Sequence, residues 1–362
     1  MAKSQYSLID ISVRHAVYVQ QYSAHVAKQF DDFLLKMSKS IDKRLADKDI
    51  TEFTERRLQK LLKHTNEDMR DVYGKHYGVW REQLIDFADY EAGFEKRTME
   101  RVYGIVDFDI PPRVQLRAAV LSTPLSGITG ADNGLLLNQI YSRWSGATIR
   151  RIEGIIRGGY YQGLTTQDIV RQIKGTRGLK YKDGELARAQ RDITMLTRTA
   201  VQHAANAARM ETYKENDDII KGVQWVSTLD DRTTPECQSL DGQIFPPDEG
   251  PRPPAHVGCR STTIPVLDKA FAALDRDATR IAKGEDGSEI VPASQTYFEW
   301  LKTQPPEFVE SAIGPTRTKL LLNGGISATR FAELNLGRDF KPRTLAQIRQ
   351  LEPKAFLAAG IK

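Results

Sequence analysis

The sequence predicts an α+β protein that is predominantly helical, with a long N-terminal helical hairpin, a central core of helices on a small antiparallel sheet, and a helical C-terminal segment. Three observations predict this fold class. Apolar residues recur every three or four positions in the first 90 residues, as they do on one face of a helix. Runs rich in β-branched and aromatic residues, with turn signals between them, follow from about residue 220 to residue 267. After residue 267, Pro and Gly divide the chain into short segments with helical periodicity.

Length and composition favour a soluble globular protein of two or three folding units. The chain has 362 residues, of which 40% are hydrophobic and 27% charged. It has no apolar run near the roughly 20 residues that span a bilayer, and its first 25 residues lack the pattern of a secretory signal, so we expect no membrane partner. Two cysteines in 362 residues argue against a disulfide framework and fit a reducing cytoplasm.

Residues 1–110 are predicted to form the helical hairpin, with a role in docking a partner. Apolar positions from Val19 to Leu45 mark the first helix, and a second apolar stripe runs from Leu58 to Phe87. Between them, Asp49 and Glu52 are placed as a capping box for the second helix. The charged outer faces of both helices are interpreted as solvated, because nothing in the segment resembles a chemical site.

Residues 111–189 are predicted to form a basic helical segment. From residue 143 to residue 191 there are eleven Lys or Arg against four Asp or Glu, a local balance of +7 in a chain of net charge +5. Arg143, Arg150 and Arg157 are spaced by seven and lie along one helical stripe, with Arg151 beside it. Such a stripe can bind DNA phosphates without reading sequence. A solvated face, or one that meets an acidic protein, is the alternative.

Residues 190–267 are predicted to form the α+β core, and residues 268–362 the C-terminal helical segment. The core begins with an Ala-rich helix whose small side chains permit close packing. Strands are predicted for "VQWVST" and "RSTTIPV", and an Asp-Gly turn signal lies in "SLDGQIF". Short helices are expected in "LDKAFAALDRDATRIAKGEDG" and around 298–301, 316–322 and 344–350.

Cys237, His256 and Cys259 form the cysteine/histidine cluster of the core. Two thiolates and one imidazole could bind zinc, but the fourth ligand has to be chosen among Asp230, Asp231 and Asp241, and no Cys-x-x-Cys pair is present. Cysteine catalysis would need an oriented base, and no nucleophile-elbow context accompanies the cluster. The favoured interpretation is therefore structural: both cysteines are small buried side chains, and His256 hydrogen-bonds a backbone carbonyl to hold the proline-rich loop.

The order and spacing of several motifs in this region resemble the tailed-bacteriophage head-morphogenesis family, the minor head proteins related to protein F of phage Mu. The motifs are an Arg-Thr helix, a Trp-bearing strand, a D-x-R-T turn, a cysteine, a Leu-Asp-Gly and a Pro-x-His-x-x-Cys-Arg ending. They fall on Arg198, Thr199, Trp225, Asp230 or Asp231, Arg232, Thr233, Cys237, Leu240, Asp241, Gly242, His256, Cys259 and Arg260. The resemblance extends over about 145–350. Many relatives end the last motif with a further cysteine, where this chain has Ser261.

The resemblance implies a minor capsid protein, made in the host cytoplasm and incorporated near the portal vertex of the virion. Its implied partners are the portal protein, other head proteins and the packaged DNA, whose packaging or ejection it would influence. It implies no enzymatic activity and no cofactor, because a family does not by itself supply a site. The alternative is an enzyme domain carried in the virion, either ADP-ribosyltransferase-like or cysteine-dependent, with Asp230, Asp231, Arg198 or Cys237 converging in a cleft.

Overall fold

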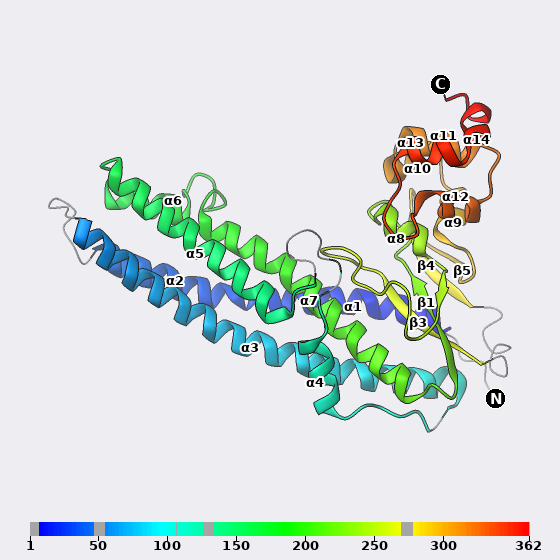
Figure 1. Cartoon of the computed structure of the whole chain (residues 1–362), viewed down its shortest axis with the longest axis horizontal. Coiled ribbons are helices and arrows are strands. Elements are labelled where there is room, and N and C mark those ends of the chain that lie inside the picture. The colour runs from blue at the N-terminus through cyan, green and yellow to red at the C-terminus, as the bar shows by residue number, and fades with distance from the viewer. Residues whose placement is uncertain are drawn as a thin grey trace.

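The computed structural model describes residues 7–46, 55–105, 107–125, 127, 134–268 and 278–361. The molecule is elongated: long helices run side by side through most of its length, and the small sheet and the short C-terminal helices gather at one end (Figure 1). This architecture confirms the predicted class, predominantly helical α+β with a small antiparallel sheet. None of the described helices is both long and apolar enough to cross a membrane.

The long helices form a bundle rather than an isolated hairpin. The bundle contains α1 (Leu8–Lys28), α2 (Phe30–Ala46), α3 (Glu55–Tyr103), α4 (Arg113–Ser122), α5 (Leu137–Tyr161), α6 (Thr166–Lys174) and α7 (Glu185–Glu215). The predicted first helix is interrupted at Gln29, whose N–H bonds back to Val26 and Ala27, so α1 and α2 are separate helices. The predicted capping box at Asp49 and Glu52 lies outside the described residues.

Helix α7 joins the predicted core to the N-terminal helices. It packs along both α3 and α1. Its small residues Ala200, Ala204 and Ala208 are fully buried, which allows the close approach predicted from the Ala-rich sequence. One hydrophobic cluster therefore runs from Val19 to Ala208, across the boundaries placed at 110 and 190. The domain boundaries themselves remain a prediction.

Aromatic side chains from α2, α3 and α5 pack together in the middle of this cluster. His76 lies edge-on to Phe30 and donates or accepts a hydrogen bond at 2.6 Å with the hydroxyl of Tyr141. Trp144 packs edge-on against both Phe30 and Tyr73. The histidine is 3% exposed, and burial lowers its pKa from 6.5 to about 4.

We expect His76 to make the bundle less stable as the pH falls from about 6.5 towards 4. In the folded state the imidazole stays neutral, whereas in the unfolded chain it binds a proton below about pH 6.5. The free energy of unfolding is therefore highest above that pH and falls as the pH is lowered from about 6.5 towards 4. The loss amounts to at most about 3 kcal/mol, at about 1.4 kcal/mol per pH unit. Urea midpoints across this range should fall less steeply in His76→Phe than in the wild type. His25→Gln, at an exposed position, should keep the wild-type slope, and equal slopes in all three proteins would contradict the prediction.

The small sheet confirms the strands predicted between residues 220 and 267. Its order is β2-β1-β3, formed by β1 (Ile220–Val226), β2 (Ile244–Phe245) and β3 (Thr262–Leu267), and both pairings are antiparallel. The short helix α8 (Pro235–Leu240) lies between β1 and β2 in the chain. A proline-rich segment of residues 251–261, here called the strap, leads into β3.

The helix expected in "LDKAFAALDRDATRIAKGEDG" is wrong for its described part. Strands β4 (Thr279–Gly284) and β5 (Gly287–Pro292) form an antiparallel hairpin there. Alternate residues Arg280 and Ala282 are buried, which is the two-residue period of a strand. Glu285 and Asp286 form the tight connection, and Gly287 takes the positive φ of 109° that the turn requires. Residues 269–277 lie outside the described part of the chain.

Short helices complete the C-terminal end as predicted. They are α9 (Tyr297–Leu301), α10 (Pro306–Ile313), α11 (Pro315–Asn323), α12 (Ala328–Asn335), α13 (Leu345–Leu351) and α14 (Pro353–Ala358). They enclose a separate hydrophobic cluster that includes Trp300, Phe331 and Phe356. Ala282 of the hairpin and Leu229, which follows β1, belong to the same cluster, so the C-terminal helices rest on the sheet region.

Candidate functional site

The motif residues of the central core come together around α8 and the strap. Trp225 of β1, Cys237 and Leu240 of α8, and Cys259 of the strap share a small hydrophobic cluster. Trp225 is fully buried, and its indole N–H donates to the hydroxyl of Ser227 at 2.8 Å. The tryptophan therefore serves as a core residue of the strand.

An arginine of the strap binds the turn that follows β1. The two terminal nitrogens of Arg260 donate to the two carboxylate oxygens of Asp230 at 2.5 and 2.8 Å. The hydroxyl of Thr233 donates to the same carboxylate at 3.0 Å. Burial raises the pKa of Asp230, but the hydrogen bonds and charge of Arg260 outweigh it and hold that pKa below its ordinary value. The aspartate of the turn motif was left open between Asp230 and Asp231, and Asp230 is the one that makes these contacts. Asp231 and Arg232 are exposed.

The Leu-Asp-Gly motif ends α8 and connects it to the hairpin. The Asp241 carboxylate accepts hydrogen bonds from the Ser227 N–H at 2.7 Å and from Arg280 of β4 at 2.6 and 3.1 Å. Gly242 has a positive φ of 81°, and a Cβ there would lie 2.9 Å from the side chain of Thr296. A glycine is needed at this position for both reasons.

Helix α7 holds the strap from the other side. The Gly258 N–H donates to the hydroxyl of Thr199 at 3.1 Å, and the Gln202 side chain donates to the Ser261 carbonyl at 2.6 Å. Arg198 precedes Thr199 and is half-buried; its side chain makes no hydrogen bond or ion pair with the described part of the chain. Thr199 thus has a clear role in fixing the strap, whereas Arg198 has no partner in the described part of the chain.

The predicted cysteine/histidine cluster is assembled in the structure. The sulfur of Cys237 lies 3.3 Å from Nε2 of His256 and 3.8 Å from the sulfur of Cys259. One ligand atom from each of the three residues lies within 4.8 Å of the other two. Nδ1 of His256 donates to the Val257 carbonyl at 3.1 Å, so in the neutral ring the lone pair of Nε2 faces the sulfur atoms. The histidine therefore bonds a carbonyl, as predicted, and also presents a metal-ligand atom.

The two thiols have opposite pKa shifts. A hydrogen bond from Cys237 and the neighbouring imidazole hold the pKa of Cys259 well below its ordinary value against the effect of burial. The bond to Cys259, together with burial, raises the pKa of Cys237 well above its ordinary value.

This geometry is poorly suited to the alternative enzymatic role. Cys237 and Cys259 are 1% and 0% exposed, so neither sulfur can reach a substrate in this conformation. Asp230 is buried and held by Arg260, and Asp231 is exposed. The residues that the enzyme hypothesis needs in one cleft are thus divided between the interior and the surface.

The predicted arginine stripe, with Arg151 beside it, lies on α5, and Arg151 and Arg157 have carboxylate partners. Arg151 pairs with Glu185 at 2.5 Å and with Asp192 at 3.3 Å, and Arg157 pairs with Glu153 at 2.8 Å. Arg143 and Arg150 are exposed, and Arg150 has no carboxylate partner among the described residues. DNA contact by these four residues remains a prediction.

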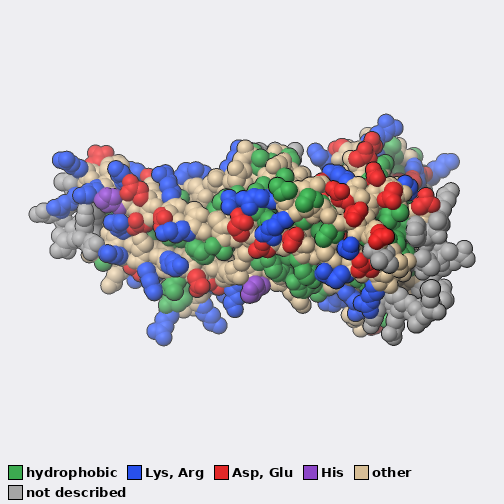
Figure 2. Space-filling view, turned by 90° about the horizontal axis from the view of Figure 1, so that it is seen from below, with side chains coloured by type: hydrophobic (Ala, Val, Ile, Leu, Met, Phe, Trp, Pro, Cys, Tyr) green, Lys and Arg blue, Asp and Glu red, His purple; other side chains and the backbone are tan. Residues whose placement is uncertain are grey.

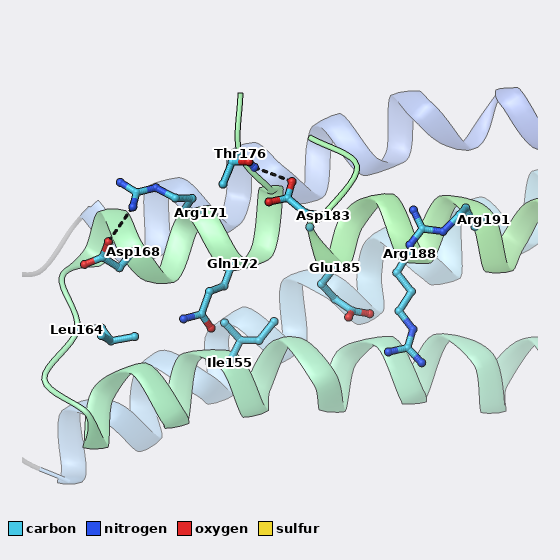
Figure 3. Close-up of a pocket in the computed structure, with 11 residues that line it drawn as sticks. Ile155, Leu164, Asp168, Arg171, Gln172, Thr176, Asp183, Glu185, Arg188 and Arg191 are labelled. Carbon is cyan, nitrogen blue, oxygen red and sulfur yellow. Dashed lines mark hydrogen bonds and ion pairs between the residues drawn. The ribbon is translucent and has the colours of Figure 1, made fainter. Parts of the chain in front are cut away.

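A pocket of about 640 Å³ lies where α5, α6 and the start of α7 meet (Figure 3). Arg171 of α6 and Arg188 and Arg191 of α7 line it, with the Arg171 side chain directed towards Asp168. The acidic residues of the pocket are engaged locally: Asp168 pairs with Arg171, and Asp183 accepts from the Thr176 N–H (Figure 3). These three arginines were not singled out from the sequence, although each lies inside the basic stretch from residue 143 to residue 191.

The comparison with protein families gives a match over this part of the chain. Residues 150–264 match the family described as Phage Mu protein F like protein. This region is Mu protein F-like. The match covers about a third of the chain, from α5 to β3, and confirms the resemblance drawn from the motifs there. No curated protein and no solved structure matched the chain. The part of the resemblance beyond residue 264 remains a prediction.

Proposed function

We propose that the protein is a structural component of a bacteriophage head, where it acts in head morphogenesis as a minor capsid protein. The family match over residues 150–264 carries this proposal. The same residues form the strap, α8 and α7, which are fastened by Asp230–Arg260 and Thr199–Gly258 rather than arranged around an open cleft. A fastened scaffold suits an assembly role, because it presents surfaces to partners without a moving catalytic part.

We further propose that the end of the bundle opposite the sheet contacts DNA phosphates without reading their sequence. This basic end comprises α6, residues 175–184, the start of α7, and the adjoining ends of α2 and α3 (Figure 1). On the half of the molecule that contains it, Lys and Arg side chains predominate over Asp and Glu side chains on the face shown in Figure 2. Among the described residues its exposed cations include Lys36, Lys39, Lys43, Arg56, Arg57, Lys60, Lys63, Arg171, Arg177, Lys180, Lys182, Arg188 and Arg191.

Internal ion pairs favour Arg188 and Arg191 of the basic end over Arg151 and Arg157 of α5 as phosphate-binding residues. Arg151 is already paired with the carboxylates of Glu185 and Asp192, so a phosphate would have to compete with them and would bind Arg151 less favourably. Arg188 is exposed and has no internal partner among the described residues, and Arg191 bonds only the Lys182 carbonyl within that part of the chain. A DNA backbone could thus supply the counter-ions that the chain does not provide for these residues.

The triple substitution Arg171→Ser, Arg188→Ser and Arg191→Ser should weaken binding to duplex DNA by roughly tenfold or more at low salt. It should also reduce the slope of log affinity against log salt by about 3, because each lost phosphate contact removes about one released counter-ion. Both quantities can be measured by fluorescence anisotropy with two duplexes of unrelated sequence, which should bind equally.

A control triple variant removes the same charge at the far end of the molecule. Arg338, Lys341 and Lys354 are exposed on the C-terminal segment, and their replacement by serine should leave affinity and salt slope unchanged. Equal losses in the two triple variants would indicate an effect of net charge alone. An unchanged slope in the first variant would exclude the basic end as the contact surface.

We propose the portal vertex as the location, with the sheet and the C-terminal helices facing other head proteins. The support is the opposite placement of the basic end and the C-terminal cluster along one elongated molecule (Figure 1). Cryo-microscopy of assembled heads without imposed symmetry tests this location. Density for the bundle beside the portal would support it, and density distributed over the whole shell would contradict it.

A further inference from the structure

We propose that Cys237, His256 and Cys259 bind a zinc ion, with solvent as the fourth ligand. The donor set is the first reason. Two thiols and one imidazole are ligands that zinc prefers, and three protein ligands with one open position form a recognised zinc arrangement. The proposal is independent of the role in the phage head, and it replaces a purely apolar role for the two buried cysteines.

The distances between the donor atoms are those of a tetrahedral site. With Zn–S bonds of about 2.3 Å, two thiolates at the tetrahedral angle lie about 3.8 Å apart. The two sulfur atoms are 3.8 Å apart in the structure. A thiolate and an imidazole nitrogen on the same ion lie about 3.5 Å apart, and Cys237 Sγ and His256 Nε2 are separated by 3.3 Å. Because the third pair lies within 4.8 Å, small side-chain movements suffice to complete the triangle.

The surroundings orient the histidine for binding. The Val257 carbonyl accepts from Nδ1 of His256, which leaves the lone pair of Nε2 available on the side of the sulfur atoms. An acceptor of this kind behind a ligand histidine fixes its tautomer and ring orientation. The Cys259 N–H donates to the His256 carbonyl at 3.1 Å, so a tight turn holds the second and third ligands together.

Solvent is assigned as the fourth ligand because the histidine of the cluster is partly exposed. His256 is only half-buried, whereas both cysteines are in the core. Asp230 and Asp241, proposed from the sequence as fourth ligands, are bound to Arg260 and Arg280. In the part of the chain that the structure describes, the ligand group consists of three residues. A bound ion would join α8 to the strap at the point where Thr199 also holds it.

Metal analysis of the full-length protein tests the proposal directly. The protein should be prepared without a polyhistidine tag or chelator, and its zinc measured by inductively coupled plasma mass spectrometry. We expect one zinc per chain. Replacement by Co²⁺ should give a thiolate-to-cobalt charge-transfer band and the intense visible bands of tetrahedral cobalt.

His256→Gln is the decisive variant, because its half-exposed position should tolerate the change without loss of fold. It should lower zinc affinity by at least about 100-fold, more than the loss of an outer hydrogen bond costs. Cys237→Ser should lose both the metal and the cobalt charge-transfer band, with circular dichroism used to confirm that it folds. His25→Gln, at an exposed histidine of α1, should bind zinc as the wild type does.

Three results would overturn the proposal. One is wild-type protein with little zinc and no cobalt spectrum after Co²⁺ is added. Another is equal zinc content in His256→Gln and the wild type. The third is a Cys237–Cys259 disulfide found by peptide mapping under non-reducing conditions in protein purified from cells.

Discussion

Replacing Arg209 by methionine is expected to lower the free energy of unfolding by about 3–5 kcal/mol, because the change leaves two buried carboxyl groups without their cation. Arg209 lies on α7 and is 1% exposed. Its guanidinium donates to Glu95 at 2.8 Å, to Glu91 at 2.9 Å, and to the hydroxyl of Thr262 on β3. Few single substitutions have so large an effect, and those that do include the breaking of a buried ionic network.

The network around Arg209 connects four elements of the fold. His15 of α1 contacts Glu91 at 2.5 Å, and the Tyr213 hydroxyl donates to Glu95 at 3.1 Å. Burial raises the pKa of Glu95 above its ordinary value, whereas at Glu91 the charge of Arg209 outweighs burial and the pKa is lowered. Helices α1, α3 and α7 and strand β3 are therefore held in register by one cation and its partners.

The loss in Arg209→Met should depend on pH, which separates it from a simple packing defect. Without the cation, burial raises the pKa of both glutamates above the value in the unfolded chain, so the variant is most stable below that value and loses stability as the pH rises. Its deficit against the wild type should thus be larger near pH 7 than near pH 4. Guanidinium denaturation followed by circular dichroism measures this difference.

Lys75→Met is the matched control, because Lys75 and its partner Asp71 are 70% and 60% exposed on α3. It should cost less than about 0.5 kcal/mol. A deficit for Arg209→Met that is equally small, or that does not change with pH, would show that the network does not hold the bundle together.

The sequence could predict helices and strands better than it could predict this network. Glu91 and Glu95 are spaced by four on a helix whose charges were interpreted as solvated, yet both are buried. Their partner lies 114 to 118 residues away in sequence. No local pattern distinguishes a glutamate that faces water from one that faces a distant arginine. The lateral packing of α7 on α1 and α3, which brings these groups together, is a tertiary property.

The candidate site was easier to predict because its residues lie close together in the chain. His256 and Cys259 are separated by one turn, so their proximity follows from local geometry, and the hydrogen bond of His256 to a carbonyl was also predicted. The contact of Gly258 with Thr199 joins residues 59 apart and has no sequence signal. The β4–β5 hairpin was missed for a related reason. From the sequence alone, Arg280 is expected on the surface, and only its ion pair with the distant Asp241 explains why it is buried.

Asp241→Asn is expected to destabilise the C-terminal end of the molecule by about 3–5 kcal/mol, because it leaves a buried arginine without a counter-ion. Arg280 is 2% exposed and makes its ion pair with Asp241 at 2.6 Å. Asparagine has nearly the same shape and can still accept from the Ser227 N–H, so the loss reports on charge rather than packing. Since β4 belongs to the cluster of the C-terminal helices, these helices should become susceptible to protease before the bundle does.

Limited proteolysis with mass spectrometry, together with thermal melting, measures this order of loss. Asp231→Asn removes the same charge from an exposed position ten residues earlier and should behave as the wild type. Arg280→Met should cost less than Asp241→Asn, because the remaining carboxylate keeps the Ser227 N–H and can take up a proton, whereas an arginine cannot lose its charge. Equal melting temperatures for Asp241→Asn and Asp231→Asn would contradict the prediction. The attachment of the C-terminal helices to the Mu protein F-like region would then have to rest on apolar packing alone.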